Sequence, residues 1–181
     1  MPSPINAKRA PGMPESDFLE LSWEFFGELC RVLAVKVATS GYYPEVVIGI
    51  AKAGVIPGAV VASILRCDFY SLKISRDAGG ERVRARPKIL SAAPKEAAGK
   101  RVLIVDELCT SGATMRMASN ALRQVNPAEV RTATSLVKVA GFKPDYYALE
   151  TASTVVFPWD RHVLNAAGEI VVNPLYEGFI G

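Results

Sequence analysis

Two adjacent acids and a hydroxyl-rich turn are the residues of this 181-residue chain best suited to chemistry. Asp106 and Glu107 follow the apolar run 102–105, and a turn of small and hydroxyl residues occupies 110–114. Carboxylates accept hydrogen bonds from sugar hydroxyls and can meet a hydrated Mg²⁺. Hydroxyls and backbone N–H groups suit a phosphate. The spacing therefore predicts a site that takes phosphate at one end and hydroxyls or a metal at the other.

A strand and a helix must position these groups. The continuous, branched run 102–105 is typical of a parallel strand that is covered on both faces, which places the two carboxylates at its C-terminal edge. Ligands bind at that edge in open α/β sheets. Residues 113–125 predict a helix, and the dipole at its N-terminus favours a phosphate held by 110–114.

Two common phosphate-binding motifs do not fit this stretch. A Walker loop ends in Gly-Lys-Ser/Thr, but the Gly-Lys pair of this chain, Gly99 and Lys100, is followed by Arg101 and precedes the strand. A dinucleotide fingerprint needs three spaced glycines, and this turn holds only Gly112. From the residues alone, an ordinary strand that ends in a solvated acidic pair before a capped helix stays open as an alternative.

A second strand, turn and helix are predicted upstream, at 45–50, 51–54 and 56–65. A cationic lysine beside exposed amides could hold an anion, and small neighbours would let the anion approach. A solvated lysine is the alternative from composition. The turn consists of Ala51, Lys52, Ala53 and Gly54.

Taken together, these residues resemble the phosphoribosyl pyrophosphate (PRPP) signature of the type I phosphoribosyltransferases: an apolar strand, two acids, two mostly apolar positions and a Thr-Gly-x-Thr-like loop. The resemblance implies that the acids hold the ribose hydroxyls, that the loop 110–114 binds the 5′-phosphate and that the turn 51–54 holds pyrophosphate. The catalytic set that it implies is Asp106, Glu107, Lys52 and Thr110. The donor-binding set is Thr110, Ser111, Gly112, Ala113, Thr114, Ala51, Ala53 and Gly54.

The C-terminal third is similar to the 6-oxopurine branch of that family, especially the xanthine-guanine phosphoribosyltransferases, because an apolar-Pro-Trp-acid stretch closes it at 157–160. The resemblance covers most of residues 45–160. It implies that Lys138 approaches the oxygen at purine position 6 and that Val155 contacts the base through its backbone. Thr154 stands where an aromatic ring usually stacks on the base. The implied metal set is Asp106, Glu107 and Asp160.

Two positions depart from the 6-oxopurine pattern. Thr110 stands where those enzymes usually carry an Asp that handles a proton of the base, and a threonine is no general base near neutral pH. Thr154 lacks an aromatic face. Three functions stay open: Mg²⁺-dependent transfer from PRPP to xanthine, guanine or hypoxanthine in purine salvage, a PRPP- or nucleotide-binding regulatory protein with little turnover, and transfer to a non-purine acceptor.

A basic segment lies at 76–88, with five basic residues, two acids and a Gly-Gly pair. In the resembling family a flexible loop at this place closes over the transition state, so we expect a mobile loop that excludes water. A solvated basic hairpin is the alternative on composition.

The length and the 50% hydrophobic content predict a single domain at 15–181 after a proline-rich, flexible arm at 1–14. The expected fold is α/β, a parallel-sheet core flanked by helices, with a small C-terminal hood at about 139–181. An apolar stripe predicts a helix at 16–39 that is wide enough for a dimer interface.

We expect a cytoplasmic enzyme that acts on PRPP and a nucleobase as a homodimer or higher homo-oligomer. No charge-free run is long enough to cross a membrane, and a net charge of +3 does not require a nucleic-acid partner. Three widely spaced cysteines predict a reducing compartment rather than disulfides or zinc, with Cys109 packed in the core. His162 is expected at the surface.

Overall fold

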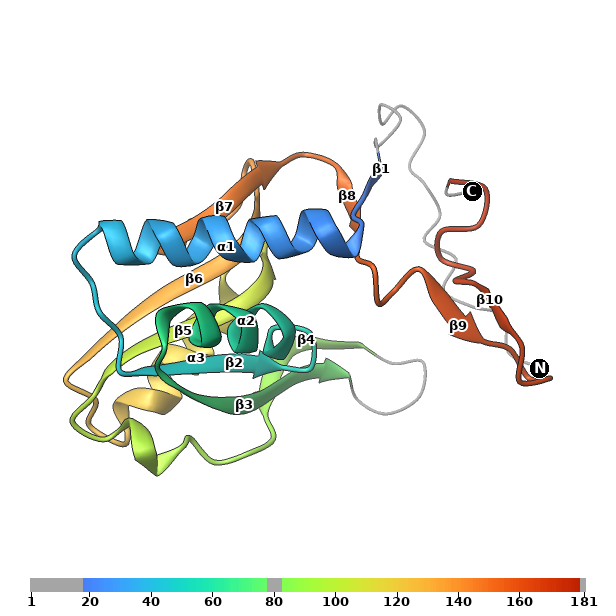
Figure 1. The fold of residues 1–181 in the computed structure, drawn as a ribbon. Coiled ribbons are helices and arrows are strands. Elements are labelled where there is room, and N and C mark those ends of the chain that lie inside the picture. The colour runs from blue at the N-terminus through green and yellow to red at the C-terminus, as the bar shows by residue number, and fades with distance from the viewer. Residues whose placement is uncertain (1–17, 78–82, 180–181) are drawn as a thin grey trace.

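The computed structural model describes residues 18–77 and 83–179. A six-stranded sheet forms its centre, in the order β4-β3-β2-β5-β6-β7, and only the β3–β4 pair in it is antiparallel (Figure 1). This arrangement confirms the predicted α/β fold with a parallel core. The strands of this sheet are β2 (Val46–Ala51), β3 (Asp68–Asp77), β4 (Val83–Ile89), β5 (Arg101–Cys109), β6 (Glu129–Lys138) and β7 (Tyr146–Thr151).

Helices cover both faces of the sheet. α1 (Trp23–Thr39) and α2 (Val55–Leu65) lie on one face and α3 (Ala113–Arg123) on the other, and a short 3₁₀ helix, η1 (Lys95–Ala97), precedes β5 (Figure 1). Successive strand side chains alternate between the faces. Leu103 packs in the α1/α2 cluster and Ile104 in the α3 cluster, both fully buried. Two covered faces explain why the strand reads as a continuous apolar run.

The order in which strands are added to the sheet reverses between the parallel neighbours β2 and β5, because β3 and β4 lie on one side and β6 and β7 on the other. Doubly wound sheets bind ligands at such a point. β2 pairs with β5 as far as Gly49 and Val105, whereas the last residue of β2, Ala51, pairs with Lys73 of β3. The two central strands therefore separate immediately before Asp106. β5 itself continues beyond the predicted end of the strand, because β6 still pairs with it at Cys109.

The prediction of a helix at 16–39 is wrong at its start. α1 begins at Trp23, and Phe18–Glu20 form strand β1, which pairs in parallel with β8 (Thr154–Val156). Ser22 caps the helix, since its side-chain oxygen accepts a hydrogen bond from the Phe25 N–H at 3.2 Å. The apolar pattern continued across this boundary because Leu19 packs against the same core cluster as α1.

The hood is smaller than the predicted 139–181, because β7 belongs to the central sheet. Outside that sheet lie the β1–β8 pair and an antiparallel hairpin of β9 (His162–Leu164) and β10 (Ile170–Val172). The hairpin projects beside the carboxyl ends of the strands (Figure 1). The expected arm at 1–14 and the centre of the expected mobile loop, 78–82, lie outside the described residues. On either side of 78–82 the backbone forms the β3–β4 hairpin.

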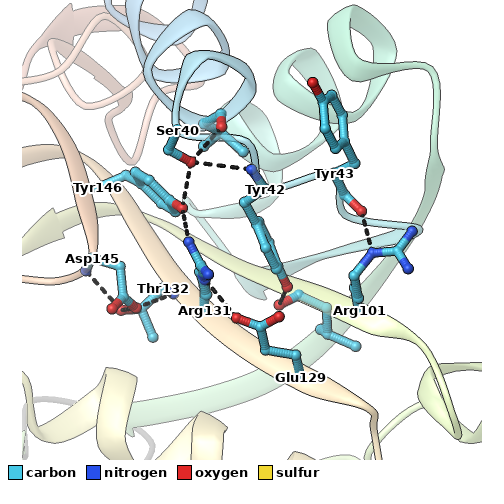
Figure 2. Close-up of polar contacts among 11 residues, drawn as sticks. Ser40, Tyr42, Tyr43, Arg101, Glu129, Arg131, Thr132, Asp145 and Tyr146 are labelled. Atoms are coloured by element: carbon cyan, nitrogen blue, oxygen red, sulfur yellow. Dashed lines mark hydrogen bonds and ion pairs between the residues drawn. The ribbon is translucent and has the colours of Figure 1, made fainter.

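Hydrogen bonds and ring contacts connect the amino ends of the strands (Figure 2). This end of the sheet lies away from the β9–β10 hairpin (Figure 1). The Tyr146 hydroxyl lies 2.8 Å from Ser40 Oγ and accepts a hydrogen bond from Arg131 Nη1 at 2.6 Å. The Arg131 guanidinium lies 4.4 Å from the centre of the Tyr42 ring, and the Tyr42 hydroxyl donates to the Val102 carbonyl at 2.8 Å. Burial raises the pKa of Tyr42. This end of the sheet is fixed by satisfied polar groups.

Candidate active site

A cavity of about 430 Å³ lies at the carboxyl end of β5. Asp106 and every residue from Leu108 to Met115 line it. The cavity thus contains the whole predicted phosphate loop, 110–114, together with one of the two predicted acids. It lies where β2 and β5 separate, at the position that the sheet order favours for a ligand.

The phosphate loop leads into α3 through a left-handed glycine. Gly112 is the N-cap of α3 with φ 70° and ψ 6°, and no side chain caps the helix. The Ala113 N–H has a long contact, 3.4 Å, to Ser111 Oγ, and the Arg116 N–H donates to the Gly112 carbonyl at 2.9 Å. The amides of the first turn therefore stand at the cavity with little internal competition, as an anion site requires.

The two acids differ in burial. Asp106 is only 9% exposed, and Glu107 is half-buried. Burial, and then the negative charge of Glu107, raises the pKa of Asp106 well above its ordinary value. The Glu107 N–H donates to Asp106 Oδ1 at 3.1 Å, which holds the carboxylate in place. A cation or hydroxyl donors at this position would favour the ionised form of Asp106.

The turn between β2 and α2 packs directly on Asp106. A Cβ atom at Gly54 would lie 2.7 Å from Asp106 Oδ1 and 2.9 Å from Asp106 Cα, so only glycine fits there. Lys52 is exposed in this turn, and the peptide bond between Ala51 and Lys52 is cis. The structure therefore places the predicted pyrophosphate turn against the predicted sugar-binding acids.

Asp160 lies outside the central sheet, in the hood, and interacts electrostatically with Glu107 and Lys52. Burial and the charge of Glu107 raise the pKa of Asp160, and Lys52 lowers it. Tyr176 joins this group, because burial and the charge of Asp160 raise the pKa of its hydroxyl. Asn173 Nδ2 donates to the Asp160 carbonyl at 2.9 Å and fixes the tail nearby. Sequence reasoning missed Tyr176, which belongs to no motif.

The structure restricts the kind of metal site that the predicted ligands Asp106, Glu107 and Asp160 can form. In the described parts of the chain, no three His, Cys, Asp or Glu side chains gather into a cluster that could hold an ion. Asp106, Glu107 and Asp160 therefore do not form a closed protein site. Mg²⁺ usually keeps several waters and takes one or two carboxylates plus substrate phosphates, and the adjacent Asp106 and Glu107 fit that donor set.

Lys138 ends β6 beside the predicted base-binding segment. Its Nζ donates to the Ser153 carbonyl and lies 3.5 Å from the Ala152 carbonyl, and burial lowers its pKa. Thr154 and Val155 follow at once in β8, and Val155 is buried. The structure therefore brings the three predicted base-binding residues to one place, whereas none of them lines the cavity of the phosphate loop.

The model of the phosphoribosyl transferase domain matches residues 21–165 of this chain. The chain belongs to the phosphoribosyltransferase family. As a member, it is a transferase enzyme, and the predicted family and fold class are confirmed. The matched region contains the cavity, both acids, the turn 51–54 and the base-binding segment.

Similar proteins include purine enzymes of this family. The chain is 29% identical over 148 residues to the xanthine-guanine phosphoribosyltransferase of Gluconobacter oxydans (strain 621H), covering 79% of this chain and 84% of that protein. A purine phosphoribosyltransferase structure from Pyrococcus horikoshii Ot3 is 28% identical, with a TM-score of 0.68 over 79% of this chain and 93% of that one. The Helicobacter pylori xanthine-guanine-hypoxanthine phosphoribosyltransferase, 18% identical, shares the fold with a TM-score of 0.66 over 78% of this chain and 92% of its own.

The remaining predictions for this phosphoribosyltransferase concern single side chains. Cys30, Cys67 and Cys109 are free thiols, and Cys109 is buried at 4% exposure, as predicted for a packing residue. His162 is exposed, also as predicted. In the described residues, no helix is long and apolar enough to cross a membrane.

Proposed function

We propose that this enzyme transfers the 5-phosphoribosyl group of PRPP to a 6-oxopurine base, xanthine, guanine or hypoxanthine, and releases pyrophosphate in purine salvage. One observation carries the proposal. An anion turn at 51–54, a cavity around 110–114 and a lysine beside 152–155 lie at the carboxyl ends of neighbouring strands. These are the three subsites that a phosphoribosyl donor, its leaving group and a base would need.

The donor half uses charge and position. The amides and hydroxyls of 110–114, Thr110 among them, would bind the 5′-phosphate, and Asp106 and Glu107 would accept hydrogen bonds from the ribose hydroxyls. Lys52 would stabilise the negative charge that develops on pyrophosphate as its bond to C1 breaks. Asp106 and Glu107 would hold Mg²⁺, with Asp160 as a further carboxylate near the ion. The ion would supply positive charge to the pyrophosphate group.

The acceptor half is built on the end of β6. The Lys138 ammonium would donate to the oxygen at purine position 6, and its contact with the Ser153 carbonyl directs it toward the segment that carries Thr154 and Val155. The backbone at Val155 would contact the base. Thr110 offers no group that accepts the base proton near neutral pH, so its role stays with the phosphate.

Release of pyrophosphate tests the proposal. The protein is incubated with Mg²⁺, PRPP and single bases, and we expect turnover with at least one of xanthine, guanine and hypoxanthine. Asp106→Asn combined with Glu107→Gln should weaken PRPP binding at least tenfold, since charge-assisted hydrogen bonds are lost. The control, Glu28→Gln with Glu96→Gln, removes the same charge from exposed sites outside the cavity.

Other outcomes would replace the proposal. PRPP binding without turnover on any base would indicate a regulatory protein, and turnover on a non-purine base alone would indicate a different acceptor. Unchanged PRPP affinity in the double variant would show that the acids are not the donor site.

We also propose that the enzyme works in the cytoplasm as a homodimer or higher homo-oligomer, on small molecules and without a nucleic-acid or membrane partner. Support for self-association comes from the exposed side of α1, where Phe25 and Val35 are 44% and 46% exposed. Sedimentation would measure the assembly, and a monomer at assay concentration would contradict it.

A further inference from the structure

The loop between β6 and β7 docks on the phosphate loop. The Phe142 N–H donates to the Thr110 carbonyl at 2.7 Å. The Phe142 ring covers Gly112 so closely that a Cβ atom there would lie 2.5 Å from two ring carbons. A Cβ atom at Gly141 would lie 2.5 Å from the Thr110 carbonyl oxygen, so both glycines are needed for this close approach.

The same loop begins at the proposed base-binding lysine. The Gly141 N–H donates to the Lys138 carbonyl at 2.9 Å, and Lys143 Nζ donates to it at 3.3 Å. Residues 139–142 therefore connect the base side of the site to the phosphate side by backbone contacts. Phe142 is held from both directions and presents its ring at the N-terminus of α3.

Arg116 lies over this ring. Its guanidinium carbon is 5.3 Å from the centre of the Phe142 ring. Helix side chains lean toward the N-terminus of their helix, so an arginine in the first turn of α3 extends back toward the phosphate loop. A cation on the face of an aromatic ring is attracted by the ring quadrupole, which limits where this exposed side chain points.

Arg116 lies close to the cavity wall. Gly112 and Met115 line the cavity, the Phe142 ring covers Gly112, and Arg116 follows Met115 in the chain with its guanidinium over that same ring. The guanidinium is therefore near the wall formed by Gly112. A guanidinium presents a planar set of donors that matches phosphate oxygens in pairs.

We propose that Arg116 is a further phosphate-binding residue of this enzyme, held beside the cavity wall at Gly112 by Phe142, and that it binds the 5′-phosphate of the donor. This inference rests on the proposed function, because it assumes that the cavity takes that phosphate. Arg116 adds a formal positive charge to a loop whose own donors, at 110–114, are neutral.

Two simple ligands separate this role from a general electrostatic effect. Ribose 5-phosphate carries the phosphate that Arg116 would bind, and pyrophosphate would bind instead at the turn around Lys52. Isothermal titration calorimetry measures each ligand alone with the full chain and Mg²⁺. Arg123→Gln is the matched control: Arg123 is on the same helix, is exposed, and donates to Asn120 Oδ1 at 3.1 Å.

We expect Arg116→Gln to raise the Kd of ribose 5-phosphate about tenfold to a hundredfold, as for the loss of charge-assisted hydrogen bonds. The Kd of pyrophosphate should change by less than about twofold, since an exposed charge at a distance is screened. Arg123→Gln should leave both ligands within about twofold of the wild type. Phe142→Leu, which keeps an apolar side chain but removes the ring, should weaken ribose 5-phosphate alone.

The opposing results are equally clear. Wild-type affinity of Arg116→Gln for ribose 5-phosphate would overturn the proposal, and so would equal weakening of both ligands. Wild-type protein that binds neither ribose 5-phosphate nor PRPP would overturn the proposed function itself, and the role of Arg116 with it. Circular dichroism of each variant checks that the fold is kept.

Discussion

Replacing Gly112 by alanine should show how closely the phosphate loop and the loop of Phe142 fit together. Gly112 has a φ of 70°, in the left-handed region that only glycine adopts freely. Its missing side chain is also where the Phe142 ring lies: a Cβ atom would be 2.5 Å from two ring carbons and 2.8 Å from Phe142 Cβ. Because Phe142 Cβ is itself too close, ring rotation alone cannot relieve the overlap.

The expected cost has two parts. An alanine in the left-handed region costs about 1–2 kcal/mol, and forcing the Phe142 loop outward costs about 1–3 kcal/mol as an overpacked contact. The Gly112→Ala variant should therefore lose about 2–5 kcal/mol of unfolding free energy, as the sum of those ranges. Outward movement of Phe142 would also stretch its hydrogen bond to the Thr110 carbonyl, so PRPP affinity should fall as well.

Denaturant unfolding of four variants separates the two parts. Gly99 has a φ of 69°, and a Cβ atom there would meet nothing within 4 Å, so Gly99→Ala measures the backbone cost alone, about 1–2 kcal/mol. Phe142→Ala and the double variant Gly112→Ala/Phe142→Ala complete a double-mutant cycle. In the Phe142→Ala background, Gly112→Ala should cost less than in the wild-type background but more than Gly99→Ala, because residue 142 keeps the Cβ atom that would lie 2.8 Å from the new methyl group.

Two results would refute this reasoning. If Gly112→Ala in the wild-type background cost only as much as Gly99→Ala, the ring would not restrict this position. If the cost stayed at its full value after removal of the Phe142 ring, the strain would come from another neighbour.

Four further predictions follow from buried or closely packed groups. Asp106→Asn should be more stable than the wild type at pH 8, because the raised pKa of Asp106 makes the native wild type lose stability as pH rises above the ordinary value of 3.8. The unfolding free energies of the two proteins, measured against pH, should converge below that pH, and a difference that widens in acid would contradict the assignment. Gly54→Ala should lose about 1–3 kcal/mol of stability in urea unfolding, because its Cβ would lie 2.7 Å from the Ile50 carbonyl oxygen and from Asp106 Oδ1; a neutral effect would show that the turn moves freely. Lys138→Met should raise the KM for the base about tenfold or more while the KM for PRPP changes little, and steady-state kinetics with an equal rise in both would place Lys138 elsewhere. Tyr146→Phe should lower the thermal midpoint, because the lost hydrogen bonds of its hydroxyl cost about 1–3 kcal/mol of unfolding free energy (Figure 2). It should leave kcat unchanged, since the hydroxyl lies at the end of the sheet opposite the cavity, and a lower kcat would contradict that independence.

The proposed donor half of the site could be located from the sequence because its parts are local. The apolar run 102–105, the two acids and the loop 110–114 follow one another along 13 consecutive positions from Val102 to Thr114. Each strand that ends in a parallel sheet delivers its following turn to the same edge. The turn 51–54 and the loop 110–114 therefore meet near Asp106 as a consequence of topology. The buried strands predicted a parallel sheet, and the family resemblance implied that the two turns serve one site.

Contacts between distant segments could not be predicted in this way. Phe142 covers Gly112 although it lies 30 positions further along the chain, and Tyr176 in the C-terminal segment interacts electrostatically with Asp160. Neither residue belongs to an element with a repeating pattern, so hydrophobic periodicity carries no information about where it packs. The predicted start of α1 was wrong for a related reason. Leu19 of strand β1 packs against the same cluster as the apolar face of the helix, so the apolar pattern alone did not separate the two elements.

The two ends of the central sheet differ in how well their groups are satisfied. At the amino ends, Arg131 donates a hydrogen bond to the Tyr146 hydroxyl and lies over the Tyr42 ring, and this arrangement favours rigidity. At the carboxyl ends, Asp106 is buried beside a second acid, and Gly54 and Gly112 occupy positions where any side chain would collide. These departures from local rules of stability occur together at this second end. Because proteins retain such costs where function requires them, they support the candidate active site by a physical criterion that is independent of the family match.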